Sequence, residues 1–185
     1  MEIFDIVDEN GRPTGKTVER TTAHREGIRH RTAHIWVIRQ RNGIYECLLQ
    51  KRSLCKDSFP GQYDTSSAGH IHAGDEIVDS AIRELEEELG IKTEQEDLKS
   101  AGSFVIKVDK VFHSEEFHDR EIAFVFVYDK DVDIKDLHLQ KEEVDEVRWF
   151  SVEETYNAVK KRESWCCVPT EGLKVLMKYL SLPLT

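Results

Sequence analysis

Three glutamates on one face of a predicted helix constrain this chain most. A helix is predicted over about residues 75–89, because apolar residues recur there at helical spacing and Gly90 follows. At about 100° per residue, with Glu84 set at zero, Glu87 lies at about −60° and Glu88 at about +40°. The apolar stripe of the same helix is centred at roughly 110°, and it consists of Val78, Ala81, Ile82, Leu85 and Leu89. The acidic arc therefore borders the buried face, where the floor of a cleft would lie.

Such an arc of carboxylates is a candidate site for a hard divalent cation. Like charges within one helical turn repel each other, at a cost of a few tenths of a kcal/mol per pair. Mg²⁺ prefers oxygen ligands and keeps some of its waters, which leaves room for substrate phosphates. With a formal net charge of −10, the chain can still bind an anionic phosphate substrate if such a cation supplies the positive charge. A solvated acidic helix face is the alternative interpretation.

The order of the other predicted elements favours an α+β fold. The dipeptides Asn10-Gly11 and Asn42-Gly43 each separate two apolar segments and predict β-hairpins. Further strands are expected over residues 63–68, 103–111, 122–128 and 146–150, and a polar stretch over residues 113–120 is expected to connect the second and third of these. Strands and helices are mixed without strict alternation, which is typical of α+β proteins.

Two helices are predicted near the C-terminus. Ser151 followed by Glu154 matches a capping box and predicts a helix start, and a last amphipathic helix follows Pro169. We expect one domain over residues 1–185, with an N-terminal hairpin over about residues 1–20 and C-terminal helices over about residues 151–182.

Composition restricts the compartment and the partners. No apolar run approaches the roughly 20 residues of a membrane span, and the N-terminus lacks the basic start and apolar stretch of a signal peptide. Cys47, Cys55, Cys166 and Cys167 contain no C-x-x-C pair and are expected as reduced thiols. The acidic chain is expected to be cytoplasmic and to bind neither nucleic acid polymers nor membranes. Whether it forms a homodimer is left open.

The segment from Gly69 to Ile91 closely resembles the Nudix box. That signature reads G-x5-E-x7-R-E-U-x-E-E-x-G-U, where U is a bulky aliphatic residue. Every fixed position matches except one, since Asp75 stands where the family usually has Glu. The resemblance implies a Nudix fold, in which a mixed β-sheet is sandwiched between helices (α/β/α). It also implies metal-assisted hydrolysis of a nucleoside diphosphate linked to another moiety.

The same resemblance implies roles for individual residues of the box. The implied ligands of Mg²⁺, with Mn²⁺ as the alternative ion, are Glu84, Glu87 and Glu88. Glu87 is counted among the catalytic residues together with Arg83, which is implied to orient a carboxylate. Gly69 and Gly90 are expected where the backbone geometry requires glycine. Asp75 is shorter than the usual Glu but is expected to cap the helix N-terminus.

Further segments are similar to type I isopentenyl diphosphate isomerase and to the Nudix module of a two-part plant protein. These segments are residues 24–30, 59–64, 66–70 and 139–144. The isomerase has a catalytic cysteine just before the box glycine, where this chain has Ala68. The adjacent serines cannot easily replace a thiol, because a hydroxyl is far less acidic, and this argues against isomerase activity. The isomerase's metal-binding histidines have counterparts in His24, His30 and His70, for which ordinary packing roles are the alternative.

Hydrolysis requires a carboxylate that accepts the proton of the attacking water. Glu121 is the first candidate for this base, since it follows the polar stretch and begins an apolar strand; it is also the counterpart of the isomerase's catalytic glutamate. Glu142 and Glu143, from a different loop, are the alternatives.

The expected substrate is a small compound that contains a diphosphate. Lys51 and Arg52 end a predicted strand and are candidates for binding its phosphates, as is His70 beside the box. We therefore expect a magnesium-dependent pyrophosphohydrolase. The alternatives are an isopentenyl diphosphate isomerase-like enzyme and a catalytically quiet Nudix domain that binds a nucleotide.

Overall fold

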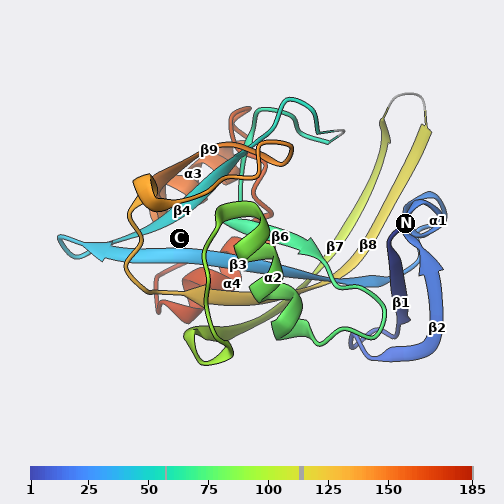
Figure 1. Cartoon of the computed structure of the whole chain (residues 1–185). Coiled ribbons are helices and arrows are strands. Elements are labelled where there is room, and N and C mark those ends of the chain that lie inside the picture. The colour runs from blue at the N-terminus through green and yellow to red at the C-terminus, as the bar shows by residue number, and fades with distance from the viewer. Residues whose placement is uncertain (57, 113–114, 185) are drawn as a thin grey trace.

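A mixed seven-stranded sheet forms the centre of the described chain (Figure 1). The computed structural model describes residues 1–56, 58–112 and 115–184. The strands are β3 (His30–Arg41), β4 (Ile44–Arg52), β5 (Tyr63–Asp64), β6 (Ser67–His70), β7 (Leu98–Phe112), β8 (Glu115–Tyr128) and β9 (Val144–Ser151). Their order is β5-β4-β3-β8-β7, with β6 paired to β3 and β9 paired to β4. The pair β3–β8 is parallel and the other pairs are antiparallel.

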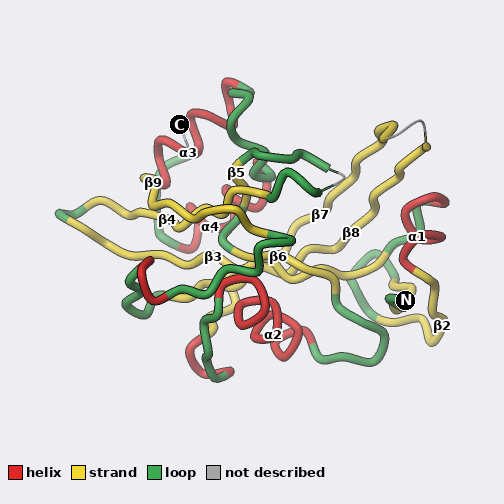
Figure 2. Tube along the Cα trace, turned by 45° about the horizontal axis from the view of Figure 1, so that its top comes forward, coloured by secondary structure: helices red, strands yellow, loops and turns green. Residues whose placement is uncertain are grey.

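Helices cover both faces of this sheet, as Figures 1 and 2 show. On one face α2 (Ile77–Leu89) packs against alternate residues of β3, among them Ile35 and Val37. On the other face α3 (Val152–Lys161) and α4 (Thr170–Tyr179) pack against Trp36 and the residues that share its side of the sheet. Alternation of side chains along a strand separates these two cores. The predicted α/β/α arrangement, a mixed sheet between helices, is confirmed.

The apolar stripe of α2 anchors the helix on the sheet. Ala81, Leu85 and Leu89 are fully buried, and Val78 and Ile82 pack at the edge of the same core. Burying a leucine side chain stabilises a fold by about 1.5–3 kcal/mol. Because the stripe fixes the rotation of α2 about its axis, it also fixes the direction in which the adjacent carboxylates point.

A hairpin and a short helix precede the sheet. Strands β1 (Ile3–Val7) and β2 (Pro13–Glu19) pair with each other and lead into α1 (Arg20–Glu26), which contacts β8. In Figure 1 this part lies at one end of the sheet, beside the ribbon formed by β7 and β8. One carboxylate oxygen of Asp5 accepts hydrogen bonds from Arg31 (2.9 Å) and from the backbone N–H of Gly74 (3.0 Å). Asp5 therefore ties the hairpin both to β3 and to the loop before α2.

Both predicted hairpins are present. The pair Arg41–Ile44 closes the second one, and its two turn residues have positive φ, 51° at Asn42 and 79° at Gly43. This combination explains the Asn-Gly dipeptide. The first hairpin has a longer loop, in which the Asp8 side chain accepts hydrogen bonds from two backbone N–H groups. The predicted capping interaction is also present, since Ser151 Oγ accepts from Glu154 N at 3.0 Å.

Three element predictions need correction. The helix begins at Ile77 rather than at residue 75, and the strand predicted over residues 63–68 is divided into β5 and β6. Residues 115–120 belong to strand β8, although their polar character indicated a connection. They pair with β7 alone, in a ribbon that extends past the other strands (Figure 1). The remaining part of that predicted connection, residues 113 and 114, lies outside the described residues.

Two further observations concern the chain as a whole. All four cysteines are free, as predicted. Within the described ranges, every helix is too short or too polar to span a bilayer.

Candidate metal and catalytic site

Glu88 lies near the point where β3 changes its neighbour. Residues 32–35 of β3 pair with β6, whereas residues 38–41 pair with β4. One carboxylate oxygen of Glu88 accepts from Gln50 Nε2 on β4 (3.1 Å) and from the backbone N–H of Ala68 on β6 (3.2 Å). The side chain is buried. Glu88 therefore satisfies polar groups of two strands that pair with different parts of β3.

Glu84 lies directly against the backbone of Gly69. A Cβ atom at position 69 would come within 2.1 Å of the Glu84 carboxyl carbon. Glycine is therefore needed here for space. Its φ angle lies outside the left-handed region, so the backbone conformation does not require glycine as expected. The close approach of the Glu84 carboxylate requires it instead.

Replacing Gly69 by Ala should displace the Glu84 carboxylate. We expect at least about tenfold lower turnover and a loss of about 1–3 kcal/mol in unfolding free energy, as is typical of overpacking. Phosphate release and thermal unfolding measure the two effects. Gly172→Ala on α4 is a matched control, because its new Cβ would lie 2.9 Å from the Phe104 ring, in the core on the α3–α4 face. The control should lose stability but keep its turnover; equal loss of turnover in both variants would contradict the assignment.

Arg83 orients two of the three predicted ligands. Its Nη1 lies 3.0 Å from Glu84 Oε1 and 3.5 Å from Glu87 Oε2. Its Nη2 donates to the backbone carbonyl of His70 at 3.1 Å. The guanidinium therefore links α2 to β6 and holds Glu84 beside Gly69. Glu87 is more exposed, since 54% of its side-chain surface is accessible.

The two buried carboxylates lack sufficient compensating positive charge. Burial raises the pKa of Glu84 to about 7, although Arg83 opposes this shift. Burial raises the pKa of Glu88 to about 8, and the charge of Glu84 raises it further. A divalent cation bound between them would favour both ionised forms. Hard carboxylate oxygens are the donors that Mg²⁺ and Mn²⁺ prefer, so Glu84, Glu87 and Glu88 fit such an ion.

A loop before β9 lies on the C-terminal end of α2. The backbone N–H groups of His138 and Gln140 donate to the carbonyls of Leu89 (3.0 Å) and Glu88 (3.1 Å). Glu143 follows in the same loop, and its charge raises the pKa of both Glu84 and Glu88. Its neighbour Glu142 is exposed. Of the two alternative bases in this loop, Glu143 is therefore the less exposed one and the one whose charge acts on the carboxylates of α2.

Gly90 allows this loop to reach the helix. It ends α2 with a φ of 73°, and its N–H bonds to the carbonyl of Glu86 at 2.9 Å. An added Cβ would lie 2.8 Å from the His138 side chain. The predicted need for glycine at this position is confirmed.

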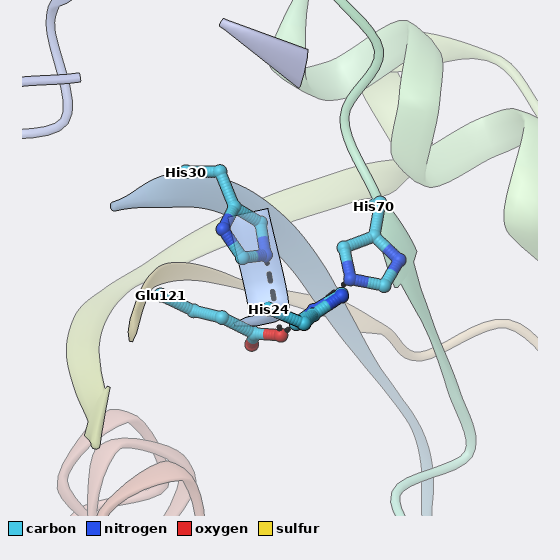
Figure 3. A group of neighbouring side chains, drawn as sticks. All are labelled: His24, His30, His70 and Glu121. Carbon is cyan, nitrogen blue, oxygen red and sulfur yellow. Dashed lines mark ion pairs between the residues drawn. The ribbon is translucent and has the colours of Figure 1, made fainter. Parts of the chain in front are cut away.

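A second cluster, here called the histidine cluster, consists of His24, His30, His70 and Glu121. Figure 3 shows the four side chains converging from α1, β3, β6 and β8. One ligand atom from each lies within 4.8 Å of the others. Glu121 Oε1 is 3.9 Å from His30 Nε2 and 3.7 Å from His70 Nε2. These separations exceed hydrogen-bond length and leave space between the groups.

Buried polar atoms in and beside the histidine cluster lack a hydrogen-bond partner among the described residues. They are His30 Nε2 and His70 Nε2 in the cluster and Oδ1 of the neighbouring Asp119. His30 Nδ1 is 2.9 Å from the carbonyl of Ile28. Because a carbonyl can only accept, Nδ1 carries the proton and the lone pair of Nε2 points into the cluster. Unsatisfied buried atoms of this kind are explained by a ligand between them.

The charge states of the histidine cluster also suit a metal. Burial is the main cause that lowers the pKa of His24 to about 4, and it lowers the pKa of His30 and His70 as well. The three imidazoles are therefore neutral near pH 7, which is the coordinating form. Burial raises the pKa of Asp119 to about 6 and that of Glu121 well above its ordinary value. Imidazole and carboxylate together suit Mn²⁺, Fe²⁺ or Zn²⁺.

Phe4 closes the histidine cluster from the N-terminal hairpin. Its ring is fully buried and stacks on His30 and His70, with centroid distances of 4.8 and 4.6 Å. The sequence did not indicate this contact. Asp119 was missed as well, although it lies two residues before Glu121 on the same strand and therefore on the same face. That spacing could have indicated it.

Several predicted site residues lie elsewhere than expected. Glu121 lies within β8 rather than at its start, and its Oε2 accepts from Thr32 Oγ1 at 2.9 Å, which leaves Oε1 for the histidine cluster. Arg52 bonds to the backbone and side chain of Ser58 and lies 3.3 Å from Asp64, so it holds its own loop. Lys51 is 3.9 Å from Glu146.

The capping prediction for Asp75 is wrong. Glu76 occupies the N-cap position without a side-chain hydrogen bond, and the exposed Asp75 carboxylate is 3.8 Å from His72. The turn before the helix is instead held by the bond from Gly74 to Asp5.

Comparison with known proteins agrees with this fold. Residues 28–166 match the NUDIX domain model. The chain belongs to the Nudix family, whose hydrolases generally use divalent metal ions.

Two relatives and three solved structures describe the similarity more closely. Nudix hydrolase 3 of Arabidopsis thaliana is 38% identical over 165 residues, which cover 88% of this chain and 21% of that protein. An uncharacterized Nudix hydrolase of Clostridium acetobutylicum is 38% identical over 143 residues, which cover 77% of this chain and 66% of that protein. The chain thus spans about a fifth and about two thirds of the lengths of these two relatives.

The solved structures share the fold at low sequence identity. DR0079 from Deinococcus radiodurans has a TM-score of 0.69 and 15% identity. The superposition covers 95% of this chain and 98% of the DR0079 chain. A Caenorhabditis elegans Ap4A hydrolase has a TM-score of 0.56 and 19% identity, with 82% and 97% covered. The NUDIX domain of Shewanella oneidensis NrtR, solved with ADP ribose, has a TM-score of 0.56 and 12% identity, with 82% and 85% covered.

Proposed function

We propose that this chain is a magnesium-dependent pyrophosphohydrolase that cleaves the diphosphate linkage of a small nucleoside diphosphate derivative. The observation that carries the proposal is the adjacent pair of the largely buried Glu84 and the buried Glu88, held by Arg83, Gln50 and the Ala68 backbone. An enzyme gains nothing from two poorly compensated buried carboxylates unless a ligand uses them. When bound, Mg²⁺ would supply Lewis acidity toward the phosphate oxygens and lower the pKa of water.

The protein's own residues have separate roles in this reaction. Glu84, Glu87 and Glu88 hold the ion, and Arg83 keeps Glu84 and Glu87 in place. Water attacks one phosphorus atom, the bond from that atom to the bridging oxygen breaks, and a carboxylate accepts the proton of the water. Glu143 suits this role because its charge acts on Glu84 and Glu88.

A different role follows for Glu121. Its strongest electrostatic neighbour is Asp119, and its free oxygen faces the histidine cluster. Glu121 then serves as a ligand of a second divalent cation in that cluster. Residues 1–27 are then also needed for function, because they contribute His24 and Phe4 to this site. Both residues lie outside the stretch that matches the family model.

A screen for phosphate release tests the proposal directly. It is coupled to a phosphatase for Ap4A, ADP ribose and nucleoside diphosphate sugars, whose cleavage yields phosphate monoesters, and to inorganic pyrophosphatase for nucleoside triphosphates. Ap4A and ADP ribose are the first compounds to test, since structural neighbours act on or bind them. Nucleoside di- and triphosphates and nucleoside diphosphate sugars follow, each with Mg²⁺ or Mn²⁺ and with a chelator. Activity that the chelator leaves unchanged would sink the proposal, as would failure on every compound.

The histidine cluster favours one second candidate, an isopentenyl diphosphate isomerase-like enzyme. That enzyme resembles this chain in its metal-binding histidines, but it needs a cysteine where this chain has Ala68. Residues 68 and 34 form a register pair on β6 and β3, and the methyl group at this position offers no proton for transfer to carbon.

We expect the purified chain not to interconvert isopentenyl and dimethylallyl diphosphate. Transfer of a proton to or from carbon needs an acid and a base of the enzyme positioned beside the substrate. The side chain of Ala68 can act as neither. Isotope exchange from deuterated water into either compound, followed by mass spectrometry, measures this. Ala68→Cys alone should also stay inactive, because partner groups must be placed within fractions of an ångström. Isomerisation by the unmodified chain at an enzyme-like rate would overturn the hydrolase proposal.

A further inference from the structure

Lys56 and Glu143 join two loops beside the carboxylates of α2. Lys56 lies between β4 and β5, and Glu143 lies just before β9. The Lys56 ammonium donates to the Glu143 carboxylate, and both side chains are partly buried, with 24% and 34% of their surface exposed. The backbone N–H of Ser53 also donates to the Glu143 carbonyl at 2.9 Å. The backbone contact holds the two loops together independently of the ion pair.

The Lys56–Glu143 ion pair acts electrostatically on the carboxylates of α2 and on the histidine cluster. The loop that carries Glu143 bonds to the end of α2, where the Gln140 N–H donates to the Glu88 carbonyl at 3.1 Å, and the charge of Glu143 is among those that raise the pKa of Glu84 and Glu88. The charge of Lys56 is among those that lower the pKa of His70 in the histidine cluster. The pair therefore lies within electrostatic reach of both proposed cation sites, where a diphosphate would meet it.

The neighbouring arginines are held more firmly than Lys56. Arg83 contacts Glu84, Glu87 and the carbonyl of His70. Arg52 bonds to two atoms of Ser58 and contacts Asp64. A phosphate that recruited either arginine would have to break several bonds. Lys56 has a flexible side chain and would have to break only its contact with the Glu143 carboxylate. A phosphate can therefore recruit Lys56 more easily than either arginine.

We propose that Lys56 and Glu143 exchange partners when substrate binds, so that the ammonium moves to a substrate phosphate and the released carboxylate turns to the attacking water. This inference rests on the proposed hydrolase function. A phosphate group carries more negative charge than a carboxylate and competes well for an ammonium. Before binding, Lys56 neutralises a carboxylate that would otherwise repel Glu84 and Glu88. The exchange therefore couples release of the base to the arrival of substrate.

Binding of imidodiphosphate in the presence of Mg²⁺ tests the exchange without any turnover. Lys56→Met should weaken this binding about tenfold, the equivalent of one lost charge-assisted contact, and should raise KM more than it lowers kcat. Glu143→Gln should tighten it, because Lys56 loses a competing partner, while kcat falls about 100-fold through loss of the base. Calorimetry measures the binding, and phosphate release measures the kinetics.

A charge-swapped variant separates this mechanism from a merely structural ion pair. The double change K56E/E143K restores opposite charges and should recover thermal stability, yet binding and turnover should stay low. The swap D97K/K130E is the matched control, because Asp97 and Lys130 also join distant segments, at 3.0 Å. It should bind imidodiphosphate normally.

Three outcomes would overturn the exchange. They are unchanged binding in Lys56→Met, equal weakening in Glu143→Gln and Lys56→Met, and recovery of turnover in K56E/E143K. Failure of the underlying hydrolase proposal looks different, since the unmodified chain would then release no phosphate from any compound. The binding measurements retain their meaning in that case, because they require no hydrolysis.

Discussion

Glu88→Gln should lower turnover by more than about 100-fold while it stabilises the metal-free chain. Loss of even an outer partner of a metal ligand typically costs about 10- to 100-fold, and Glu88 is proposed as a direct ligand. Gln keeps the size of the side chain and an oxygen that can still accept from Gln50 and Ala68. The fold should therefore survive the change.

The stability gain follows from the pKa of Glu88. This pKa is about 8 in the folded chain and 4.5 for an ordinary glutamate. Since the unfolded chain ionises Glu88 at lower pH, metal-free stability falls as pH rises from about 4.5 to about 8. Gln cannot ionise, so Glu88→Gln should lack this loss and gain on the order of 1–3 kcal/mol at pH 7. Thermal unfolding in a chelator across pH 5–9 measures the difference.

The matched control for this experiment is Glu86→Gln on the same helix. Glu86 is half exposed and lies 3.6 Å from Lys92, away from the acidic arc. The control removes the same charge but should keep the turnover of the unmodified chain and the pH dependence of its metal-free stability. Mg²⁺ should stabilise the control and the unmodified chain at pH 8, and should have little effect on Glu88→Gln. Equal activity in all three proteins would refute a role for Glu88 in metal binding.

Local sequence spacing was sufficient to predict the acidic arc. The relative positions of Glu84, Glu87 and Glu88 depend only on the helical repeat and on which stripe is apolar. The groups that complete the site depend on the tertiary fold. Gln50 and Glu143 lie 38 and 55 residues from Glu88 in sequence, and the backbone N–H of Ala68 reaches it because β6 pairs with β3 beside α2. No local pattern encodes those distances.

The errors also have physical causes. Residues 115–120 are polar because β8 leaves the body of the sheet there and pairs with β7 alone, so polarity indicated a loop where the backbone is extended. Asp75 was expected as a cap because it precedes the apolar stripe. The bond from Gly74 to Asp5 instead fixes a turn at this point, and α2 begins two residues later. In both cases a long-range contact overrides a local preference.

Family resemblance and geometry contribute differently to the histidine cluster. The resemblance indicated His24, His30 and His70, which lie 46 residues apart at most. It did not indicate that Phe4 stacks on two of these rings, or that their unpaired nitrogens face Glu121. These contacts make the cluster a candidate cation site in this chain and connect it to the N-terminal hairpin.

His70→Gln should weaken binding of Mn²⁺ at the histidine cluster by more than about 10- to 100-fold. The measurement is made in the Glu88→Gln background, in which the carboxylate site on α2 is already impaired, so that calorimetry reports the cluster alone. Bound Mn²⁺ at 100 times its dissociation constant should stabilise the parent by about 2.7 kcal/mol. His72→Gln is the matched control, because His72 is 40% exposed and lies outside the cluster.

The pH dependence of this binding has a defined sign. Burial lowers the pKa of His24 from 6.5 to about 4 in the folded chain, so the unfolded chain takes up its proton first as pH falls. Metal-free stability should therefore decrease between about pH 6.5 and pH 4. Protons compete with Mn²⁺ for the same nitrogens, so the Mn²⁺-dependent gain should be large at pH 7 and nearly absent at pH 4.5. His70→Gln should show little gain at either pH, whereas His72→Gln should follow its parent. If His70→Gln binds Mn²⁺ as tightly as that control, the unpaired nitrogens of the cluster do not form a cation site.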